Sequence, residues 1–271
     1  MVKVEYHIIS GKVIETRRGY MNLSARKKVR GQRIAGNTSL RKIAANEREQ
    51  SRRLARTLNC NFGSGLMLVT LKYSNARLPK SYEEACEVSE KYLRKVRNAY
   101  KKATGDTLLY VNVNANWSPK HNCPARLHHH IVLPADVSLD LLEKCWVQGE
   151  FHVKRVNNPS DLSGLADYLC RNVRCESGKK KYTTAKNMAK PICTEPKIVD
   201  DVESIPALPK TSVVDAQQTK DEDGVVVGAY LRAIAAEPIK VRGGMVILPK
   251  HGRKKDRAPV FEMDEVLNYD E

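Results

Sequence analysis

Three consecutive histidines, His128, His129 and His130, are the residues whose type and spacing point most directly to chemistry. The apolar run Ile-Val-Leu follows them, which is typical of a β-strand. Side chains alternate between the two faces of a strand, so His128 and His130 share one face and His129 points to the other. Two imidazoles on one open face can bind one divalent metal ion. The alternative is a surface or core pair without metal, and His129 is expected to be a packed or hydrogen-bonded core histidine.

The elements that would position these histidines follow one another in a regular order. β-forming residues predict strands over residues 66–73, 108–114, 127–133 and 150–156. Helix start and stop signals predict helices over residues 81–103, 138–146 and 161–172, and a further helix with a basic face begins near Ser39. The order predicts an α+β fold of the ferredoxin-like split βαβ kind, in which an antiparallel sheet carries its helices on one face. The other face is then free for a ligand.

The charge is unevenly distributed along the chain. The 271 residues carry a formal net charge of +16. Residues 1–199 hold 37 Lys+Arg against 17 Asp+Glu, or +20, whereas residues 200–271 hold 10 against 14, or −4. A positive field of this size favours a polyanion such as nucleic acid. We therefore predict a basic N-terminal extension with a helix (1–60), a central domain (61–198), and an acidic linker with a partly disordered C-terminal extension (199–271).

The histidine strand and four segments around it resemble one known family. Arg126-Leu-His-His-His-Ile-Val-Leu133 resembles the histidine-hydrophobic-histidine motif of HUH endonucleases, specifically of rolling-circle replication initiators from single-stranded DNA phages, plasmids and mobile elements. The supporting segments are Asn59-Cys-Asn-Phe-Gly63 with the strand after it, Trp146-Val-Gln-Gly149, the tyrosine-helix motif Leu165-Ala-Asp-Tyr-Leu-Cys-Arg171, and the basic stretch 179–191. They occur in the order that the family has, and the resemblance covers about residues 37–196.

The resemblance implies a defined mechanism. His128 and His130 would hold a divalent metal, Mg²⁺ or Mn²⁺, which polarises a phosphodiester of single-stranded DNA. The Tyr168 hydroxyl would attack the phosphorus and leave a 5′-phosphotyrosine and a free 3′-hydroxyl. The implied partner is single-stranded DNA at an origin hairpin. No Gly-x-x-x-x-Gly-Lys-Ser/Thr motif is present, so a host helicase and polymerase would also be needed.

The sequence departs from the family pattern at two positions. Arg171 stands where the family usually has a lysine three residues after the tyrosine, and at that spacing it shares the tyrosine's helix face. The strand before the histidines has no carboxylate to serve as third metal ligand, which leaves Asn114, Asn116 or His152 as candidates. For DNA-backbone contacts we predict a basic set: Arg126, Lys179, Lys180, Lys181 and Lys186.

Several alternatives stay open. Tyr168 could be only a helix anchor, and Tyr182 is a competing nucleophile. Trp117 and Trp146 could stack on bases, although Trp146 in an apolar helix is more often a core residue. The same chemistry would also serve a mobilisation relaxase or a transposase, and a basic DNA-binding module with a decayed site is a non-enzymatic reading.

Composition bounds where such a protein would work. Seven cysteines in a chain that starts without a secretory signal predict reduced thiols rather than a disulfide framework. We find no apolar run of about 18 residues, the length that a membrane span needs. We therefore expect a cytoplasmic protein without a membrane partner, and the resemblance implies that the cell is a bacterial host.

Overall fold

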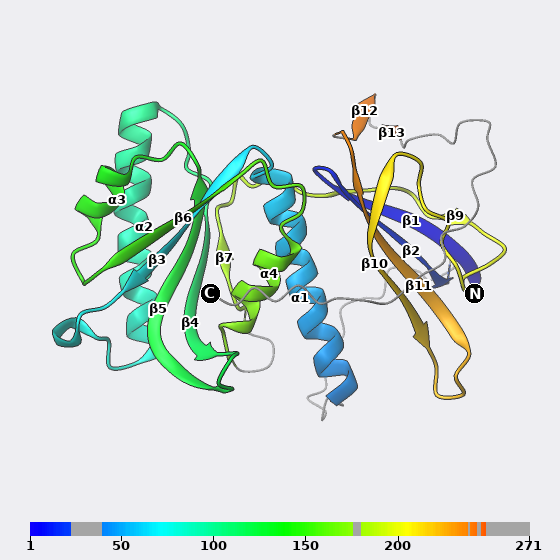
Figure 1. Ribbon diagram of the computed structural model, residues 1–271, viewed down its shortest axis with the longest axis horizontal. Helices are drawn as coiled ribbons and strands as arrows, with labels where there is room; N and C mark the ends of the chain where they lie inside the picture. The colour runs from blue at the N-terminus through cyan, green and yellow to red at the C-terminus, as the bar shows by residue number, and fades with distance from the viewer. Residues whose placement is uncertain (23–39, 176–179, 238, 243–244, 248–271) are drawn as a thin grey trace. The chain divides into compact units, whose positions relative to one another are not determined.

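The computed structural model describes residues 1–22, 40–175, 180–237, 239–242 and 245–247. As predicted, this part of the chain is α+β, with antiparallel strand pairs and four α-helices. It divides into two compact units, a middle unit and an end unit built mainly from the two ends of the chain (Figure 1). None of the helices within these ranges combines the length and the apolar character needed to cross a membrane.

The middle unit is built on a five-stranded antiparallel sheet in the order β6-β3-β5-β4-β7. Its strands are β3 (Gly65–Lys72), β4 (Val111–Ser118), β5 (Cys123–Pro134), β6 (Phe151–Asn157) and β7 (Thr183–Thr184). Its helices are α1 (Leu40–Asn61), α2 (Tyr82–Thr104), α3 (Leu139–Cys145) and α4 (Ser163–Arg171), with one 3-10 turn η1 (Asn75–Arg77). Every strand and helix predicted for this region is present within a few residues of its expected bounds.

Local signals explain why α2 begins and ends where it does. The Ser81 hydroxyl caps the helix by accepting a hydrogen bond from the Glu84 amide at 3.1 Å. Glu83 and Glu84 place negative charge in the first turn, where it interacts favourably with the helix dipole. Gly105 ends the helix in the left-handed conformation with φ of 81°.

Helices cover both faces of this sheet, so the prediction of helices on one face was wrong. One core cluster packs α1 and α4 against the sheet face that carries Val111, Val113 and Val132. The second cluster packs α2 and α3 against the opposite face. The error arose from α1: its residues Leu54 and Leu58 are completely buried, so it belongs to this core and not to a separate extension. The α1–α4 layer leaves part of its sheet face for a pocket.

The end unit contains a six-stranded sheet in the order β10-β11-β2-β1-β8, with β9 also paired to β1. Its strands are β1 (Val2–Ser10), β2 (Val13–Met21), β8 (Ile192–Cys193), β9 (Lys197–Ile198), β10 (Thr211–Lys220) and β11 (Val226–Ala235). The short strands β12 (Lys240–Arg242) and β13 (Met245–Ile247) form a separate pair. The prediction of an N-terminal extension over residues 1–60 and of an acidic linker after residue 199 therefore has to be corrected, because both segments supply paired strands.

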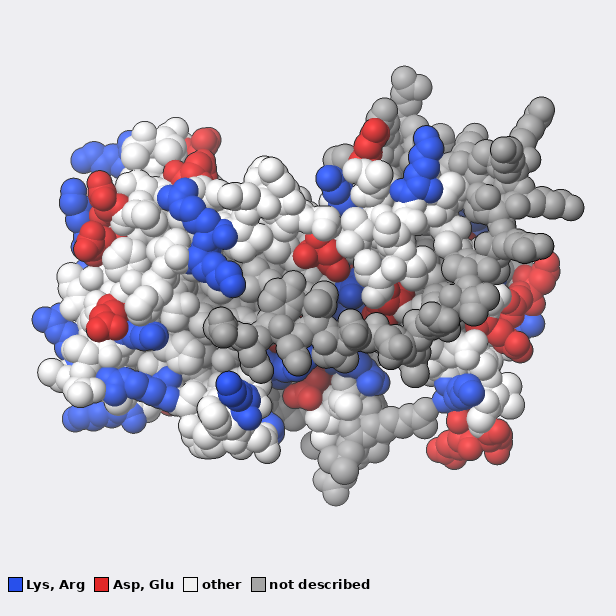
Figure 2. Space-filling view, viewed as in Figure 1, with Lys and Arg blue, Asp and Glu red and all other residues white. Residues whose placement is uncertain are grey.

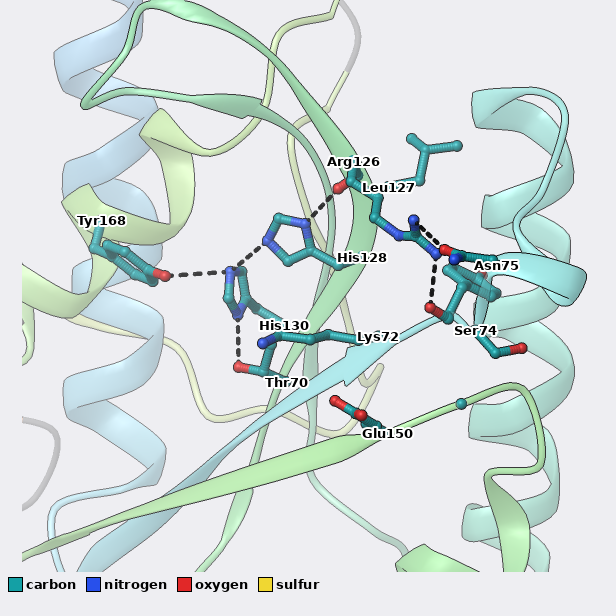
Figure 3. A pocket seen from close by; sticks show the side chains of 12 residues that line it. Thr70, Lys72, Ser74, Asn75, Arg126, Leu127, His128, His130, Glu150 and Tyr168 are labelled. Carbon is teal, nitrogen blue, oxygen red and sulfur yellow. Dashed lines mark hydrogen bonds between the residues drawn. The ribbon is translucent and has the colours of Figure 1, made fainter.

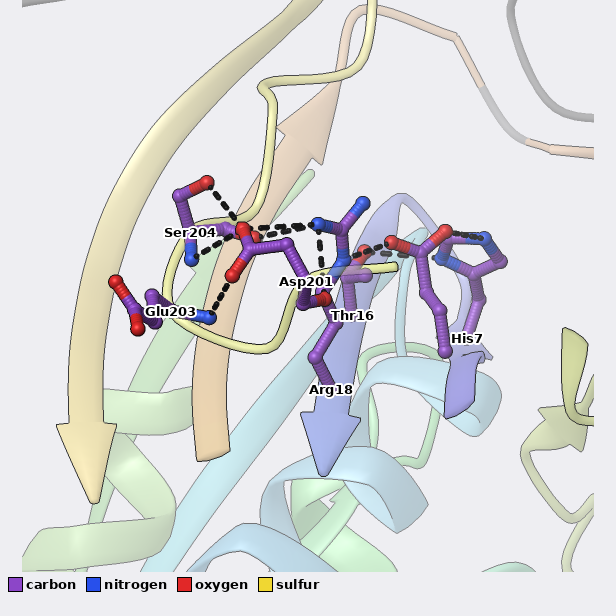
Figure 4. Close-up of polar contacts among 7 residues, drawn as sticks. His7, Thr16, Arg18, Asp201, Glu203 and Ser204 are labelled. Carbon is purple, nitrogen blue, oxygen red and sulfur yellow. Dashed lines mark hydrogen bonds and ion pairs between the residues drawn. The ribbon is translucent and has the colours of Figure 1, made fainter. Parts of the chain in front are cut away.

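Polar contacts fix the segment that was predicted to be a linker (Figure 4). Arg18 on β2 donates to Glu5 on β1 at 2.7 Å and to the Ser204 carbonyl at 2.7 Å. The Asp201 carboxylate accepts hydrogen bonds from the Glu203 amide and from the Ser204 hydroxyl and amide, and these bonds lower its pKa. Polar composition had indicated a flexible linker, but the same polar groups have partners on the strands.

Candidate active site

The three histidines occupy the middle of β5, and the register of the sheet decides what each one meets. His130 lies opposite Thr70 on β3, and His129 lies opposite Asn114 on β4. His128 and His130 line a pocket on the α1–α4 side of the sheet (Figure 3). His129 is fully buried on the other side. The predicted alternation of the histidines is confirmed.

The two pocket histidines present ring nitrogens to each other. The Nε2 atoms of His128 and His130 lie 3.2 Å apart. His128 Nδ1 lies 2.8 Å from the Arg126 carbonyl oxygen, which can only accept a hydrogen bond. Nδ1 of His128 therefore carries the proton, and its Nε2 turns a lone pair towards the pocket.

Thr70 lies at Nδ1 of His130, as the Arg126 carbonyl does at Nδ1 of His128. Its hydroxyl lies 3.1 Å from His130 Nδ1 and can either accept from or donate to that nitrogen. Burial lowers the pKa of His128 and lowers that of His130 to about 3. Both rings are therefore neutral at pH 7, which is the form that binds metals.

The spacing of this pair fits a single metal ion. Metal–nitrogen bonds of about 2.0–2.1 Å, at angles of about 90–110°, place two ligand nitrogens about 2.9–3.4 Å apart. The observed 3.2 Å lies in this range. Within the described ranges, however, no group of three or more His, Cys, Asp and Glu side chains is placed to hold a metal. The protein would therefore offer two nitrogens and leave other positions to substrate or water.

A carboxylate that the sequence argument missed lines the same pocket. Glu150 directly precedes β6, and its carbonyl accepts a hydrogen bond from the Lys72 amide at 2.8 Å. Gly149 makes this approach possible, because a Cβ there would lie 2.4 Å from the Lys72 carbonyl oxygen. Lys72, at the end of β3, contributes a cation to the pocket. The signal in the sequence was the Trp-Val-Gln-Gly motif, which marked the segment but not the residue after it.

Tyr168 projects from α4 over the histidine pair (Figure 3). Its hydroxyl oxygen lies 3.4 Å from His130 Nε2, and the side chain is 45% exposed. Burial of part of the ring raises the pKa of the hydroxyl, so it is protonated at neutral pH. The structure thus brings Tyr168 next to His128 and His130, although 38 residues separate it from His130 in the chain.

Hydrogen bonds attach the C-terminal end of α4 to the sheet and so fix the position of Tyr168 above the histidines. The carbonyl oxygen of Asn172, at the C-terminus of α4, accepts hydrogen bonds from the amides of Asn116 and Trp117, both at 3.1 Å. These amides are available because the β4–β5 register shifts between Ala115 and Trp117. The irregular stretch of the β4–β5 pair therefore serves as the anchor of the tyrosine helix.

Asn114 does not line the pocket, and the prediction that it ligates a metal with His128 and His130 is corrected. Its Oδ1 lies 2.8 Å from His129 Nδ1, and its amide nitrogen donates to Cys86 Sγ. The physical reason is the register: Asn114 pairs with His129 and so shares the opposite face of the sheet. Asn116 is also occupied, since its side chain bonds the backbone of Arg174 twice.

His152 and Arg171 lie outside the pocket lining. His152 shares the sheet face of Thr70, but its ring is exposed and lies 3.8 Å from the Glu150 carboxylate. Arg171 forms an ion pair with Asp167 one turn earlier on α4. Its predicted position on the face of Tyr168 therefore does not bring its guanidinium to the histidines in this structure.

The residues predicted to contact DNA are dispersed. Arg126 lines the pocket and donates to the Tyr73 carbonyl at 2.9 Å. Lys181 lies 3.2 Å from Glu47 on α1, whereas Lys180 and Lys186 are exposed. Lys179 lies outside the described residues.

The remaining aromatic and thiol groups behave as core or surface residues. Tyr182 packs against the α1–α4 core, where burial raises its pKa to about 12, and it does not line the pocket. Trp146 is 5% exposed and is confirmed as a core residue. All seven cysteines are free thiols, as predicted.

Comparison of the chain with protein-family models, with curated proteins and with solved structures finds no match.

Proposed function

We propose that this protein is a metal-dependent endonuclease that nicks and rejoins single-stranded DNA with Tyr168 as the nucleophile. One observation carries the proposal: the Tyr168 hydroxyl lies 3.4 Å from a neutral histidine whose Nε2 is paired with that of a second histidine at 3.2 Å. A tyrosine hydroxyl beside a metal-ligating pair is the arrangement that phosphoryl transfer to tyrosine needs.

The topology of the middle unit supports assignment to the HUH class. Its elements β3, α2, β4, β5, α3 and β6 follow the split βαβ order, and the four strands lie in the sheet order β6-β3-β5-β4. The histidines lie on a central strand and the tyrosine on the helix after the last of these strands. Within the class, the motif order favours a rolling-circle replication initiator, with a relaxase or transposase as the alternative.

The chemical step is an in-line displacement at phosphorus. The Tyr168 oxygen forms a bond to phosphorus while the bond from phosphorus to the 3′ oxygen breaks, and the electron pair leaves with that oxygen. Because His130 Nε2 is assigned to the metal, the tyrosine proton passes to solvent water, and the 3′ oxygen takes up a proton from solvent. The products are a 5′-phosphotyrosine and a free 3′-hydroxyl, and reversal of the step rejoins the strand.

Other pocket groups position the phosphate. Lys72 and Arg126 supply cations next to the histidines and attract the phosphodiester. A bound Mg²⁺ or Mn²⁺ on His128 and His130 would stabilise negative charge on the non-bridging oxygens. Glu150 also lines the pocket, but the described side chains include no group of three placed to bind one metal, so water or the phosphate would supply the remaining ligands.

A basic DNA-binding module with a decayed site is the second candidate. It is favoured by one observation, namely that the described side chains include no group of three metal-ligating residues. Binding without chemistry would need only the positive charge of the chain.

The test is the formation of a covalent protein–DNA adduct. The full chain is incubated with labelled single-stranded oligonucleotides, drawn from a random pool, in the presence of Mn²⁺ or Mg²⁺. We expect a metal-dependent adduct that Tyr168→Phe abolishes and that the matched control Tyr182→Phe retains. An adduct that persists in Tyr168→Phe would refute the nucleophile, and the absence of any adduct with wild-type protein would support the binding module.

A further inference from the structure

A tryptophan and an arginine stack on each other near the pocket. The guanidinium carbon of Arg174 lies 4.3 Å from the centre of the Trp117 ring. Arg174 is exposed and Trp117 is partly exposed. The pair therefore presents a flat cationic group and part of an aromatic ring at the surface of the middle unit.

The pair lies close along β4 to Ala115, the residue that pairs with His128. Ala115 on β4 pairs with His128, and Trp117 pairs with Pro124, two strand positions on from Arg126. The register of the two strands shifts between these two pairs, and the side chains of Asn116 and Trp117 both contact Arg174, in the segment after α4. Two residues along a strand span about 7 Å, so Trp117 lies within one or two nucleotides of His128 for an extended DNA strand.

Hydrogen bonds hold the stacked pair in a fixed position. Asn116 donates to the Arg174 carbonyl at 2.9 Å and accepts from the Arg174 amide at 2.8 Å. The Arg174 guanidinium also donates to Asn122 in the β4–β5 hairpin at 3.3 Å. Since the Trp117 amide donates to the Asn172 carbonyl at the end of α4, the pair and the helix that carries Tyr168 are joined at the same irregular stretch of β4 and β5. A preorganised surface of this kind loses little entropy when a ligand binds.

We propose that Trp117 and Arg174 form a stacking subsite for a nucleobase of single-stranded DNA, next to the scissile phosphate. The inference rests on the proposed function for the identity of the strand. Stacking on aromatic and guanidinium groups accepts any base, because every base has a π-face. In Figure 2, Lys and Arg side chains also occur at the end of the unit where Figure 1 places the β4–β5 hairpin, which favours a polyanionic ligand.

Intrinsic fluorescence gives a direct test, because the chain has two tryptophans and Trp146 is 5% exposed. The probe is oligo(dT) of about 12 nucleotides, a length typical of single-strand binding sites. Titration into full-length Tyr168→Phe protein, which cannot form the proposed adduct, is expected to quench tryptophan emission. The quenching should be lost in the double variant that carries Trp117→Phe together with Tyr168→Phe. Unquenched emission at saturating oligo(dT) would overturn the subsite.

A second measurement separates base stacking from charge and from a purely structural role. Affinity is compared for oligo(dT) and for a base-free strand of the same length and charge. Trp117→Ala should weaken oligo(dT) binding by about ten-fold and leave the base-free strand almost unaffected. Trp117→Phe, which keeps an aromatic ring, should retain most of the preference for oligo(dT).

Arg97→Ala is the matched control for Arg174→Ala. Arg97 lies over the ring of Tyr110 in another cation–π pair, on the α2 side of the sheet. We expect Arg174→Ala to reduce the preference for oligo(dT) and Arg97→Ala to leave it unchanged. If Trp117→Ala and Arg174→Ala weaken binding of oligo(dT) and of the base-free DNA strand equally, the pair only stabilises the fold. If the wild-type protein prefers oligo(dT) to the base-free strand but forms no Tyr168 adduct, the nuclease proposal is refuted and the stacking subsite is retained.

Discussion

The two faces of β5 carry the same residue type and use it differently. On the buried face, both ring nitrogens of His129 have protein partners: Nε2 lies 2.5 Å from the Tyr73 hydroxyl and Nδ1 lies 2.8 Å from Asn114 Oδ1. On the pocket face, the protein holds Nδ1 of His128 and of His130, while their Nε2 atoms face each other in the pocket, that of His130 also lying 3.4 Å from the Tyr168 hydroxyl. A histidine held at both nitrogens by core side chains is structural, whereas one held at Nδ1 with its Nε2 in a pocket is oriented for a ligand.

The strongest test of this difference removes one pocket imidazole. His130→Ala should weaken Mn²⁺ binding by about a hundred-fold or more, because a site with one nitrogen ligand loses its chelate. Isothermal titration of the purified protein measures this directly. His152→Ala is the matched control, since that exposed ring lies outside the pocket lining and should not matter. If His152→Ala lost Mn²⁺ binding and His130→Ala retained it, the metal ligand would be His152 and not His130.

Substitution on the buried face should affect stability instead. His129→Leu leaves the Tyr73 hydroxyl without its partner in the core, which costs about 2 kcal/mol or more of unfolding free energy. Urea unfolding measures the loss, and Mn²⁺ titration of the folded variant should give the wild-type affinity. If His129→Leu removed metal binding without lowering stability, the two faces would not have separate roles.

A smaller effect is expected when the support of a pocket histidine is removed. Thr70→Val keeps the shape of the side chain but deletes the hydroxyl 3.1 Å from His130 Nδ1. Loss of such a partner typically lowers metal affinity by about ten-fold. Thr57→Val provides a comparison, since that hydroxyl bonds only the Arg53 carbonyl on α1. Equal Mn²⁺ affinities for Thr70→Val and wild type would show that the ring needs no such support.

The smallest effect concerns His7, a buried histidine in the end unit. Its Nδ1 lies 2.9 Å from the Thr16 hydroxyl, and burial lowers its pKa below 6.5, with Lys197 and Arg18 lowering it further and Glu5 opposing them. The unfolded chain therefore binds more protons than the folded one below about pH 6.5, so stability is retained above that pH and falls below it. Unfolding measured at about pH 7.5 and about pH 5.5 should show a shallower decline for His7→Asn. An identical decline would mean that His7 does not contribute.

Local patterns predicted much of the middle unit, because helix caps and strand alternation depend on neighbouring residues. Ser81, Gly105 and the alternation around His129 are examples. The metal-ligand candidate Asn114 was misplaced because its face depends on pairing with a different strand. Glu150 was missed because its place in the pocket follows from its contact with Lys72, far away in the sequence.

The end unit shows the same limit more strongly. β2 pairs with β11 although more than half the chain separates them, and no local signal marks such a partner. Charge and composition therefore indicated an N-terminal extension and an acidic linker in segments that form paired strands. Long-range pairing, not strand propensity, decided the outcome for these segments.

The most direct test of the nuclease assignment is to locate the DNA on the protein. After reaction with single-stranded DNA and Mn²⁺, the protein is digested with a nuclease and a protease, and the peptides are sequenced by mass spectrometry. We expect a nucleotide attached through a 5′-phosphate to Tyr168 and to no other residue. Attachment to Tyr182, or to any residue outside the His128–His130 pocket, would contradict it.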